Sequence, residues 1–487
     1  MKQLLPPVPT AYERHVLNRV AFGWSRATYA EMRRAGGADR WIARQLNPSA
    51  IPEDPRAAAV ATRWFPDLAD GPQRRWDRQR DGSKGGWQYA LDLSNQSLLR
   101  RVYSRRQLLE AMVDFWSDHL HISGNHDSAW IYRTDYDAML RQRALGRFDD
   151  LLVAATLHPS MLLYLDNWTS TRQHPNENHG RELLELHTVG RTAGYTEAMV
   201  KDSARILSGY TLDAWRTWTP SYDPGRHARG PVQVLGFRHD NAAEDGRVVT
   251  EAYLRYLARH PATARTIATK LAVRFVSDRP SADLVARLAR TFTSSGTDIA
   301  ATLRTLFASP EFRRSAGQKV RTPDEDLIAT CRALGIRAEM PRTEKSFGRS
   351  LTWVQGGLQL YDWPRPDGRP QTAEAWSSVT RVMASYRMHW NLAAGWWPTV
   401  DVRHRPASYW VPPARRLPRG GMPFPMYVDR LCRLALGRRA TARDRAVVAQ
   451  ATGVRRTERI TPDHALARWE LVRALGALLD SPDHMTR

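Results

Sequence analysis

Residues 174–190, HPNENHGRELLELHTVG, place charged and amide side chains beside leucines at the spacing of a helix. Asn176 after Pro175 is typical of a helix start, because an asparagine at the N-cap accepts hydrogen bonds from free N–H groups, and Glu177 puts negative charge at the positive end of the helix dipole. At about 100° per residue the polar side chains share an arc of roughly 140°, with the leucines outside it. The stretch predicts an amphipathic helix of about three turns.

Helical periodicity continues on both sides of this motif. Pro159 suits the first position of a helix, Thr196 an N-cap and Gly209 a helix end. The best strand candidate is PVQVLGFR, residues 231–238, with AWRTWTPSY, residues 214–222, as its hairpin partner. These patterns predict a mainly α fold, a large irregular multi-helix bundle with a small β-hairpin near 215–239.

The length of 487 residues allows more than one domain. A Trp- and Pro-rich passage near residue 360 follows a long helical region. We therefore expect a main helical domain over 1–340, which carries the motif, and a C-terminal helical lobe over 341–487 packed on it. One continuous domain is the alternative.

The composition excludes several classes of protein. No run reaches the roughly 18 apolar residues that a membrane helix needs. Of the 72 basic residues only six are lysines, so 66 are arginines spread through the chain, which indicates a bias toward GC-rich codons more than a specific nucleic-acid site. A weaker interpretation is polyanion binding by the loops at 56–84 and 403–420. Cys331 and Cys432 lie too far apart in the chain for a C-x-x-C pair and indicate two buried free thiols.

The polar face of the motif has two interpretations. Glu177, Arg181 and Glu185 have the i, i+4 spacing of an ion-pair ladder, which explains the pattern by structure alone. Alternatively, because the preceding helices are so apolar, the face lines an interior cleft, where Glu182 and Glu185 would have perturbed pKa values and suit acid–base work or metal ligation. The sequence leaves both open.

A second cluster is FWSDHLHISGNHDSAW, residues 115–130, with His119, His121 and His126. His-x-His can hold a metal from an extended segment, but no second ligand motif stands nearby. The alternative is a partly buried His119 bonded to the backbone, with two surface histidines. His239 and Asp240 follow the strand candidate, at a loop position that suits either catalysis or a turn.

The motifs FWSDHL, ALGRFDDLLVAATLHPSMLLYLDN, NENHGRELLELHTVG, GYTE, ARILSGYTLD and DWPRPDGRP resemble the bacterial domain-of-unknown-function family numbered eighteen hundred, from about Val16 to past Trp376. The resemblance implies hallmark positions at His119, Asp166, Asn167, Asn176, Glu177, Asn178, Arg181, Glu182 and Glu185. It also implies export and a neighbouring sulfatase-like or phosphatase-like secreted protein, and so work on an envelope or extracellular polymer. No signal peptide is visible here, which favours the cytoplasm, with export as the alternative.

We therefore expect a hydrolytic enzyme, with or without help from a divalent metal. Glu182, Glu185 and His119 are the expected catalytic residues. Asn176, Asn178, Arg181 and Asp166 are expected to bind substrate. The alternative is a non-catalytic accessory or scaffold protein for a sulfatase-like partner or a cell-surface glycan.

Overall fold

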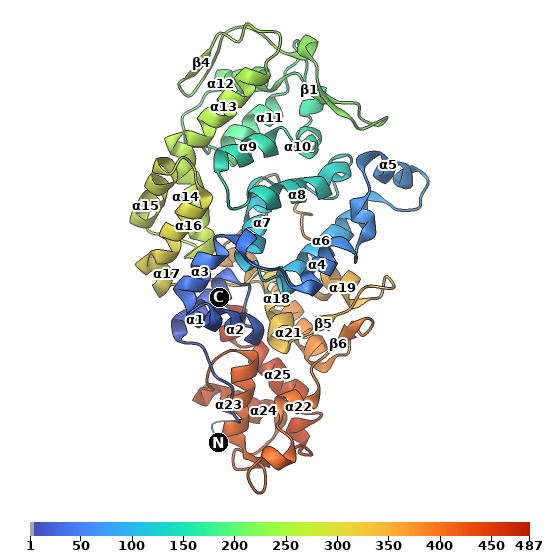
Figure 1. Ribbon diagram of the computed structural model, residues 1–487, viewed down its shortest axis with the longest axis vertical. Coiled ribbons are helices and arrows are strands. Elements are labelled where there is room, and N and C mark those ends of the chain that lie inside the picture. The colour runs from blue at the N-terminus through green and yellow to red at the C-terminus, as the bar shows by residue number, and fades with distance from the viewer. Residues whose placement is uncertain (1–3) are drawn as a thin grey trace.

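The computed structural model describes residues 4–487, which fold into many short helices and four small two-stranded antiparallel sheets (Figure 1). The mainly helical architecture predicted from periodicity is confirmed. None of the helices in this range is both long enough and apolar enough to cross a lipid bilayer.

The first half of the chain builds the middle of the molecule and one end of it (Figure 1). Its helices are α1 (Ala11–Val20), α2 (Arg26–Arg34), α3 (Ala38–Gln45), α4 (Pro55–Thr62), α5 (Pro72–Arg80), α6 (Gly86–Tyr103), α7 (Gln107–His119), α8 (Arg133–Arg143), α9 (Phe148–Thr156), α10 (Pro159–Tyr164), α11 (Glu177–Glu182), the π-helical turn η5 (Leu183–His187), α12 (Glu197–Leu207) and α13 (Arg247–Arg259).

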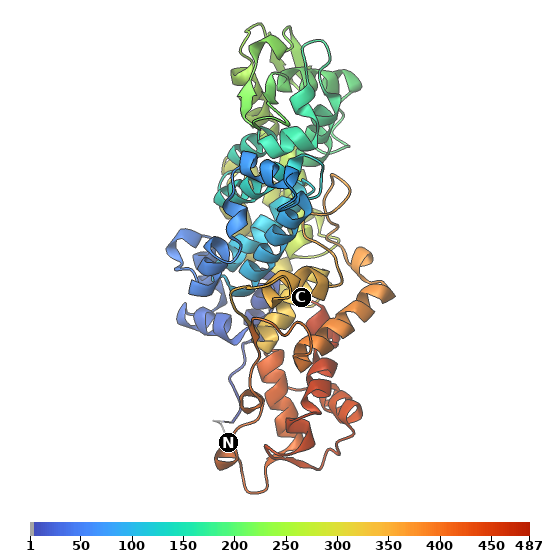
Figure 2. The same cartoon turned by 90° about the vertical axis from the view of Figure 1, so that its right-hand side faces the viewer.

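The second half runs back along the middle and forms the opposite end, as the two perpendicular views show (Figures 1 and 2). Its helices are α14 (Pro261–Phe275), α15 (Ala282–Ser294), α16 (Ile299–Ala308), α17 (Pro310–Arg314), α18 (Pro323–Leu334), α19 (Phe347–Val354), α20 (Ala373–Trp376), α21 (Val379–Ala394), α22 (Ala407–Trp410), α23 (Phe424–Ala435), α24 (Ala442–Thr452), α25 (Leu471–Leu479) and α26 (Pro482–Met485).

Helix ends follow local chemistry. The Thr196 hydroxyl accepts the N–H of Met199 at 3.4 Å at the start of α12, and Pro159 stands at the first position of α10, both as predicted. Helix α12 ends at Leu207, and Gly209 follows it with a φ of +99°, in the left-handed region that favours glycine. The predicted boundaries of these helices are therefore confirmed to within about two residues.

The strands near 215–239 form two hairpins rather than the predicted one. Strand β1 (Tyr210–Leu212) pairs with β2 (Pro220–Tyr222), and β3 (Val232–Val234) pairs with β4 (Phe237–His239). Leu235 and Gly236 both have positive φ, so they make the tight two-residue turn that joins neighbouring strands. The expected pairing of 231–238 with 214–222 is wrong because this turn folds 231–238 back on itself. The remaining sheets are β5 (Arg337–Ala338) with β6 (Val402–Arg403) and β7 (Met422–Pro423) with β8 (Arg459–Ile460).

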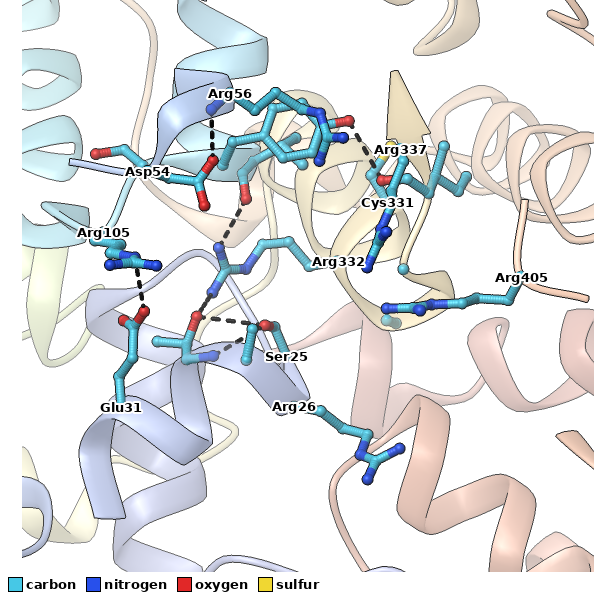
Figure 3. A pocket seen from close by; sticks show the side chains of 18 of the residues that line it. Ser25, Arg26, Glu31, Asp54, Arg56, Arg105, Cys331, Arg332, Arg337 and Arg405 are labelled. Carbon is cyan, nitrogen blue, oxygen red and sulfur yellow. Dashed lines mark hydrogen bonds and ion pairs between the residues drawn. The ribbon is translucent and has the colours of Figure 1, made fainter. Parts of the chain in front are cut away.

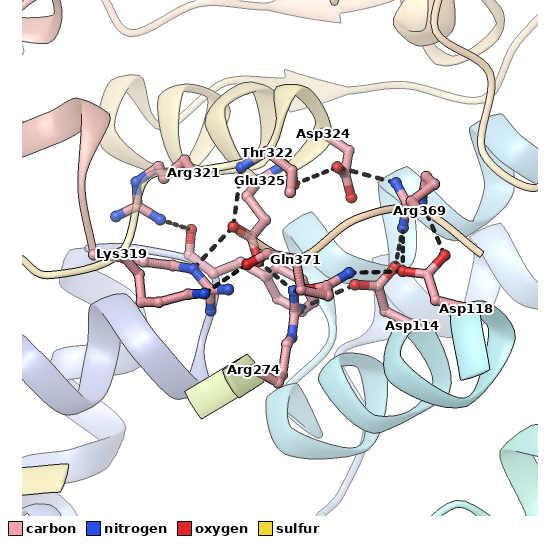
Figure 4. Close-up of polar contacts among 12 residues, drawn as sticks. Asp114, Asp118, Arg274, Lys319, Arg321, Thr322, Asp324, Glu325, Arg369 and Gln371 are labelled. Carbon is pink, nitrogen blue, oxygen red and sulfur yellow. Dashed lines mark hydrogen bonds and ion pairs between the residues drawn. The ribbon is translucent and has the colours of Figure 1, made fainter. Parts of the chain in front are cut away.

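A buried network of charged side chains joins helices in the middle of the molecule (Figure 4). Arg101 of α6 pairs with Asp114 of α7 and Asp324 of α18, each at 2.8 Å. Arg274 of α14 reaches Asp114 at 3.0 Å and Glu325 at 2.7 Å. Because charges out of water are stable only when paired, this network fixes how the four helices meet.

Residues on both sides of position 340 contact each other. Arg430 and Arg433 of α23 donate to the backbone oxygens of Leu4 at 2.6 Å and Pro6 at 2.9 Å, and Arg487 pairs with Glu325 at 2.9 Å. The predicted division into 1–340 and 341–487 stays a prediction. Cys331 and Cys432 are both buried free thiols.

Candidate active site

The motif begins as predicted and then departs from α-helical geometry. The Asn176 side chain accepts the N–H groups of Asn178 at 2.8 Å and His179 at 3.4 Å, so it caps α11. Helix α11 ends at Glu182, and Leu183–His187 form a π-helical turn. The predicted three-turn α-helix is wrong from Leu183 onward, because the wider turn changes which side chains share a face.

A close helix contact holds the motif in place. Gly180 lies against α12, and a Cβ atom at this position would stand 2.9 Å from the backbone oxygen of Val200 and the backbone nitrogen of Ala204. Leu183 and Leu184 are fully buried below the motif. The motif therefore packs through one glycine and two leucines, and its polar residues stay on the other side.

The ion pairs predicted between Glu177, Arg181 and Glu185 do not form, because Arg181 and Glu185 pair with residues outside the motif. Arg181 makes a two-pronged contact with Glu197 of α12, at 2.8 and 2.6 Å, and Glu185 pairs with Arg191 at 3.0 Å. Glu177 and Asn178 are exposed. The charges of the motif are thus matched by neighbouring segments, and the guanidinium of Arg181 is already committed to a carboxylate.

The π-turn presents backbone oxygens to two side chains from distant helices. The ring Nε2 of His119 lies 3.1 Å from the His187 oxygen, and Lys270 of α14 lies 3.5 Å from the Leu186 oxygen. Lys270 also donates to Nδ1 of His119 at 2.8 Å. Because Nδ1 accepts, Nε2 carries the ring proton and donates to His187. The motif therefore meets α7 and α14 at one junction.

Lys270 has an unusual environment for a lysine. Burial lowers its pKa from 10.5 to about 8, although Asp367 and Asp118 oppose this shift. Among the described residues no carboxylate lies within ion-pair distance of its ammonium group, whereas the buried Lys84 and Lys319 each pair with aspartates. A lysine with such a pKa exchanges its proton near neutral pH.

Glu182 is partly buried, and no ion pair or hydrogen bond of its carboxylate is found among residues 4–487. Burial raises its pKa, and the neighbouring Glu185 raises it further, against the pull of Arg191 and Arg181. Burial and the charge of Glu182 also raise the pKa of Tyr164 to about 12. Glu182 is therefore the carboxylate of the motif whose surroundings favour the protonated form.

The DWPRPDGRP segment, residues 362–370, completes the junction. Arg369 is buried and pairs with Asp114 at 2.7 Å and Asp118 at 3.0 Å (Figure 4), and Gly368 lies so close to the Asp118 backbone that no side chain would fit. This anchoring sets Asp367 where its charge acts on Lys270, Glu182 and Tyr164. The segment thus brings a carboxylate from the second half of the chain to the motif.

The other predicted histidines do not form a metal pair. His121 is buried, not on the surface, and its Nε2 contacts the Trp363 oxygen at 2.9 Å, away from the partners of His119. His126 is half-buried, and its ring packs edge-on against Tyr164 at 5.3 Å. His119 is bonded to the backbone as the structural alternative predicted, but the surface position for His121 is wrong.

The remaining predicted positions are dispersed. Asp166 is exposed and acts on His126 by its charge, and Asn167 is buried and donates to the Leu207 oxygen at 3.1 Å. His239 is exposed on β4 and accepts the N–H of Asn241 at 2.8 Å, so its ring bonds to the backbone of the loop that follows the strand. Asn167 therefore has a structural role in holding the end of α12.

A group of three side chains whose donor atoms lie within 4.8 Å of one another and could share a metal occurs once in the described residues, at Asp326, His389 and His484. It lies outside the motif. Four pockets, of about 290, 380, 130 and 940 Å³, are lined by residues outside the motif. Glu182 itself is partly exposed.

Sequence reasoning did not single out Lys270, Asp367 or Tyr164 as site residues. Asp367 and Tyr164 stand in motifs that carry the family resemblance, but no local spacing ties them or Lys270 to Glu182. One signal was present. The chain has 66 arginines and only six lysines, so a lysine within an apolar helical run is unusual. It indicates a position where the side chain must be able to lose its proton, which arginine does not do.

The junction therefore brings together parts of the FWSDHL, NENHGRELLELHTVG and DWPRPDGRP motifs, where the pKa of Glu182 is raised and that of Lys270 is lowered. No curated protein and no solved structure matches this chain. One protein family does, over residues 15–486, nearly the whole length. The chain belongs to this family, which is described as "Protein of unknown function (DUF1800)".

Proposed function

We propose that this protein is a hydrolytic enzyme with Glu182 and Lys270 as its acid–base pair. One observation carries the proposal: the surroundings raise the pKa of Glu182 and lower that of Lys270 to about 8, at the point where segments distant in the chain meet. Catalytic acids and bases need pKa values suited to their task, and burial and neighbouring charges are the means by which proteins shift them.

The two groups have complementary roles in the proposed reaction. The carboxylate of Glu182 accepts a proton from the attacking water, and the ammonium of Lys270 donates to the oxygen that gains negative charge. His119 is a positioning residue, because its Nδ1 receives a hydrogen bond from Lys270 and its Nε2 is fixed to His187. Asn178 and Asp166 are exposed and remain proposed contacts for substrate.

A divalent metal is a secondary form of this proposal. Glu182 and Glu185 interact electrostatically, but the one three-ligand group in the described residues does not include them. An ion held here would therefore keep several water ligands, as Mg²⁺ does. If the metal form holds, a chelator abolishes activity and Mg²⁺ restores it.

The proposed substrate is a polymer of the cell envelope or of the extracellular space, and the protein would then be exported. The resemblance to a family with secreted members supports this proposal. Glu182 is partly exposed, and a partly exposed catalytic group suits a long substrate better than a small enclosed one.

The test is a comparison of three variants on envelope polysaccharide, peptidoglycan and polyester substrates. Glu182→Gln is expected to lower kcat at least about 100-fold. Lys270→Arg keeps the positive charge but does not release its proton, so kcat should fall, and the loss of rate that deprotonation of Lys270 is expected to cause above about pH 8 should disappear. The exposed Glu177→Gln is the matched control and should leave activity unchanged. Equal activity of Glu182→Gln and Glu177→Gln would refute the proposal.

A scaffold for a sulfatase-like partner or a cell-surface glycan is the second candidate. The contacts of Arg181 with Glu197 and of Glu185 with Arg191 favour it, because they show that part of the motif serves to hold the fold. Trp87 is 62% exposed and offers a ring face for a sugar. If this candidate is right, Trp87→Ala lowers glycan binding, and Glu182→Gln leaves every measured function intact.

A further inference from the structure

A pocket of about 290 Å³ lies far from the motif, where the beginnings of α2 and α4 meet the end of α18 and the segment before α22 (Figure 3). Arginines dominate its lining. Seven of its 21 lining residues are arginines. At the average frequency of the whole chain, 66 arginines in 487 residues, about three would be expected. The chain-wide bias toward arginine therefore does not explain the pocket.

The positive charge of the pocket is mostly unmatched. Glu31 and Asp54 are the two carboxylates among the lining residues, and Arg105 pairs with Glu31 at 3.1 Å. The other arginines have no carboxylate within 4.0 Å in the part of the chain that the structure describes: Arg26, Arg34, Arg56, Arg332, Arg337 and Arg405. Seven positive and two negative charges leave an excess of five.

Several of these guanidinium groups are positioned without an anionic partner. Arg332 is buried and donates to the Val102 oxygen at 3.0 Å and the Thr28 hydroxyl at 2.7 Å, and burial lowers its pKa to about 10. Arg337 and Arg405 extend toward each other from separate segments, and the Nε of Arg405 is buried with no hydrogen-bond partner (Figure 3). Unsatisfied buried donors are costly, so an acceptor is expected at this point.

The negative end of the α18 helix dipole is one source of charge that could balance the arginines of the pocket, but it is too small. Its terminal carbonyl groups carry partial negative charge, and Arg405 lies beside Gly335 at this end. A helix end corresponds to about half an elementary charge, which balances one arginine in part and not an excess of five. The excess therefore favours the binding of an external anion.

We propose that this pocket binds a small, compact anion that carries a diphosphate group, either free or as part of a nucleoside diphosphate. Guanidinium groups grip phosphate oxygens in pairs, and a diphosphate concentrates about three charges in a volume that fits the pocket. The side chains of Arg56 and Arg405 already lie over the rings of Tyr103 and Tyr409, at 5.3 and 4.8 Å, which fixes their direction. This site does not involve Glu182 or Lys270, so the proposal stands apart from the catalytic one.

The test is calorimetric titration of the whole protein with inorganic pyrophosphate, ADP and citrate at about 150 mM salt, where distant charges are screened. Wild-type protein is expected to bind one pyrophosphate. In the double variant Arg337→Gln/Arg405→Gln, affinity should fall at least about tenfold. The matched control is Arg304→Gln/Arg456→Gln, two exposed arginines outside the pocket, which should change affinity less than about twofold.

The two phosphate ligands distinguish the sources of the anion. Equal affinity for pyrophosphate and ADP supports a site that recognises phosphate alone, and tighter ADP binding supports a nucleotide site. Absence of pyrophosphate binding by wild type, tighter binding of citrate than of pyrophosphate, or an equal loss in the control variant would overturn the proposal. Thermal melting of both double variants confirms that each is folded before titration.

Discussion

Glu182 and Lys270 are the residues on which the proposed chemistry depends, and each is shifted by a different balance of effects. For Glu182, burial and the charge of Glu185 both disfavour the ionised form. For Lys270, burial outweighs the nearby carboxylates of Asp367 and Asp118. Neither side chain has an ion-pair partner among the described residues, so neither shift reflects a stabilising contact.

This origin predicts the effect of Glu182→Gln on stability. A carboxyl group whose pKa is raised in the folded state lowers stability above that pKa, because the ionised form is favoured in the unfolded chain. Removal of the charge should therefore leave the melting temperature at pH 8 unchanged or raise it by about 1 °C. Differential scanning calorimetry measures this. A clear drop in melting temperature would instead identify Glu182 as part of a structural network.

Lys270 predicts that the free energy of unfolding depends on pH, in this case because a pKa is lowered in the folded state. Its folded-state pKa of about 8 lies below the ordinary 10.5, so the folded protein binds fewer protons than the unfolded chain between these values. Its contribution to the free energy of unfolding should therefore rise with pH across this window, by about 2 kcal/mol from pH 7 to 9.5.

Urea denaturation of wild type and Lys270→Met at both pH values isolates this effect, because all other groups cancel in the difference. The free energy of unfolding of wild type should rise relative to that of Lys270→Met as the pH rises. A difference between the two proteins that stays constant would mean that Lys270 has an ordinary pKa.

Sequence reasoning reached only part of this residue set. Glu182 and His119 were predicted because they stand in conspicuous local patterns. Lys270 and Asp367 are 88 and 185 residues from Glu182 along the chain, and only tertiary packing brings them near. The rarity of lysine was the one local signal, and it gains meaning only after burial is known.

At the scale of elements, the π-turn is the feature that periodicity could not show. The amphipathic pattern of 176–187 fits an α-helix, yet the chain widens after Glu182 and directs the oxygens of Leu186 and His187 toward Lys270 and His119. The distant hydrogen bonds with α7 and α14 stabilise this turn, and they are invisible in a local window. Helix starts were predictable because caps are local, as Asn176 and Thr196 show.

Gly180→Ala tests the contact that positions this element. A Cβ atom at 180 would lie 2.9 Å from backbone atoms of α12, which cannot move as a side chain can. We expect a loss of about 1–3 kcal/mol in the free energy of unfolding and lower activity. Gly146→Ala is the matched control, because its nearest neighbour would lie 3.5 Å away. Equal stability of the two variants, by urea denaturation, would show that α11 does not depend on this contact.

At the scale of the whole molecule, buried charge joins segments that lie far apart in sequence. The network around Asp114 links α6, α7, α14 and α18, and a second cluster joins α21 to α18 and to the end of α25. In the second cluster His389 contacts Asp326 at 3.0 Å and Asp480 at 2.7 Å, and these carboxylates raise the pKa of His389 to about 9 although burial opposes it. The periodicity of the sequence predicted the helices but not these links. Arg101 and Asp114 lie 13 positions apart, and the other pairs named here lie more than 50 positions apart, so only tertiary packing brings them together.

His389 therefore predicts how the whole molecule responds to base. A histidine with a raised pKa contributes its full stability below the ordinary 6.5 and loses it as the pH rises through about 9. Wild type should lose about 2–3 kcal/mol more than His389→Gln between pH 6 and 9.5. Urea denaturation at these two pH values measures the difference. Parallel pH profiles of the two proteins would show that His389 is not protonated in the folded state.

The most direct test of the central claim, that the junction shifts Lys270 toward neutral pH, is NMR titration of ¹³C-methylated lysines, because a chain with six lysines gives few signals. The structure predicts that the resonance lost in Lys270→Arg titrates with a pKa of about 8 in the wild-type protein. If that resonance titrates near the ordinary 10.5, the junction does not poise Lys270 for proton transfer and the acid–base proposal is contradicted.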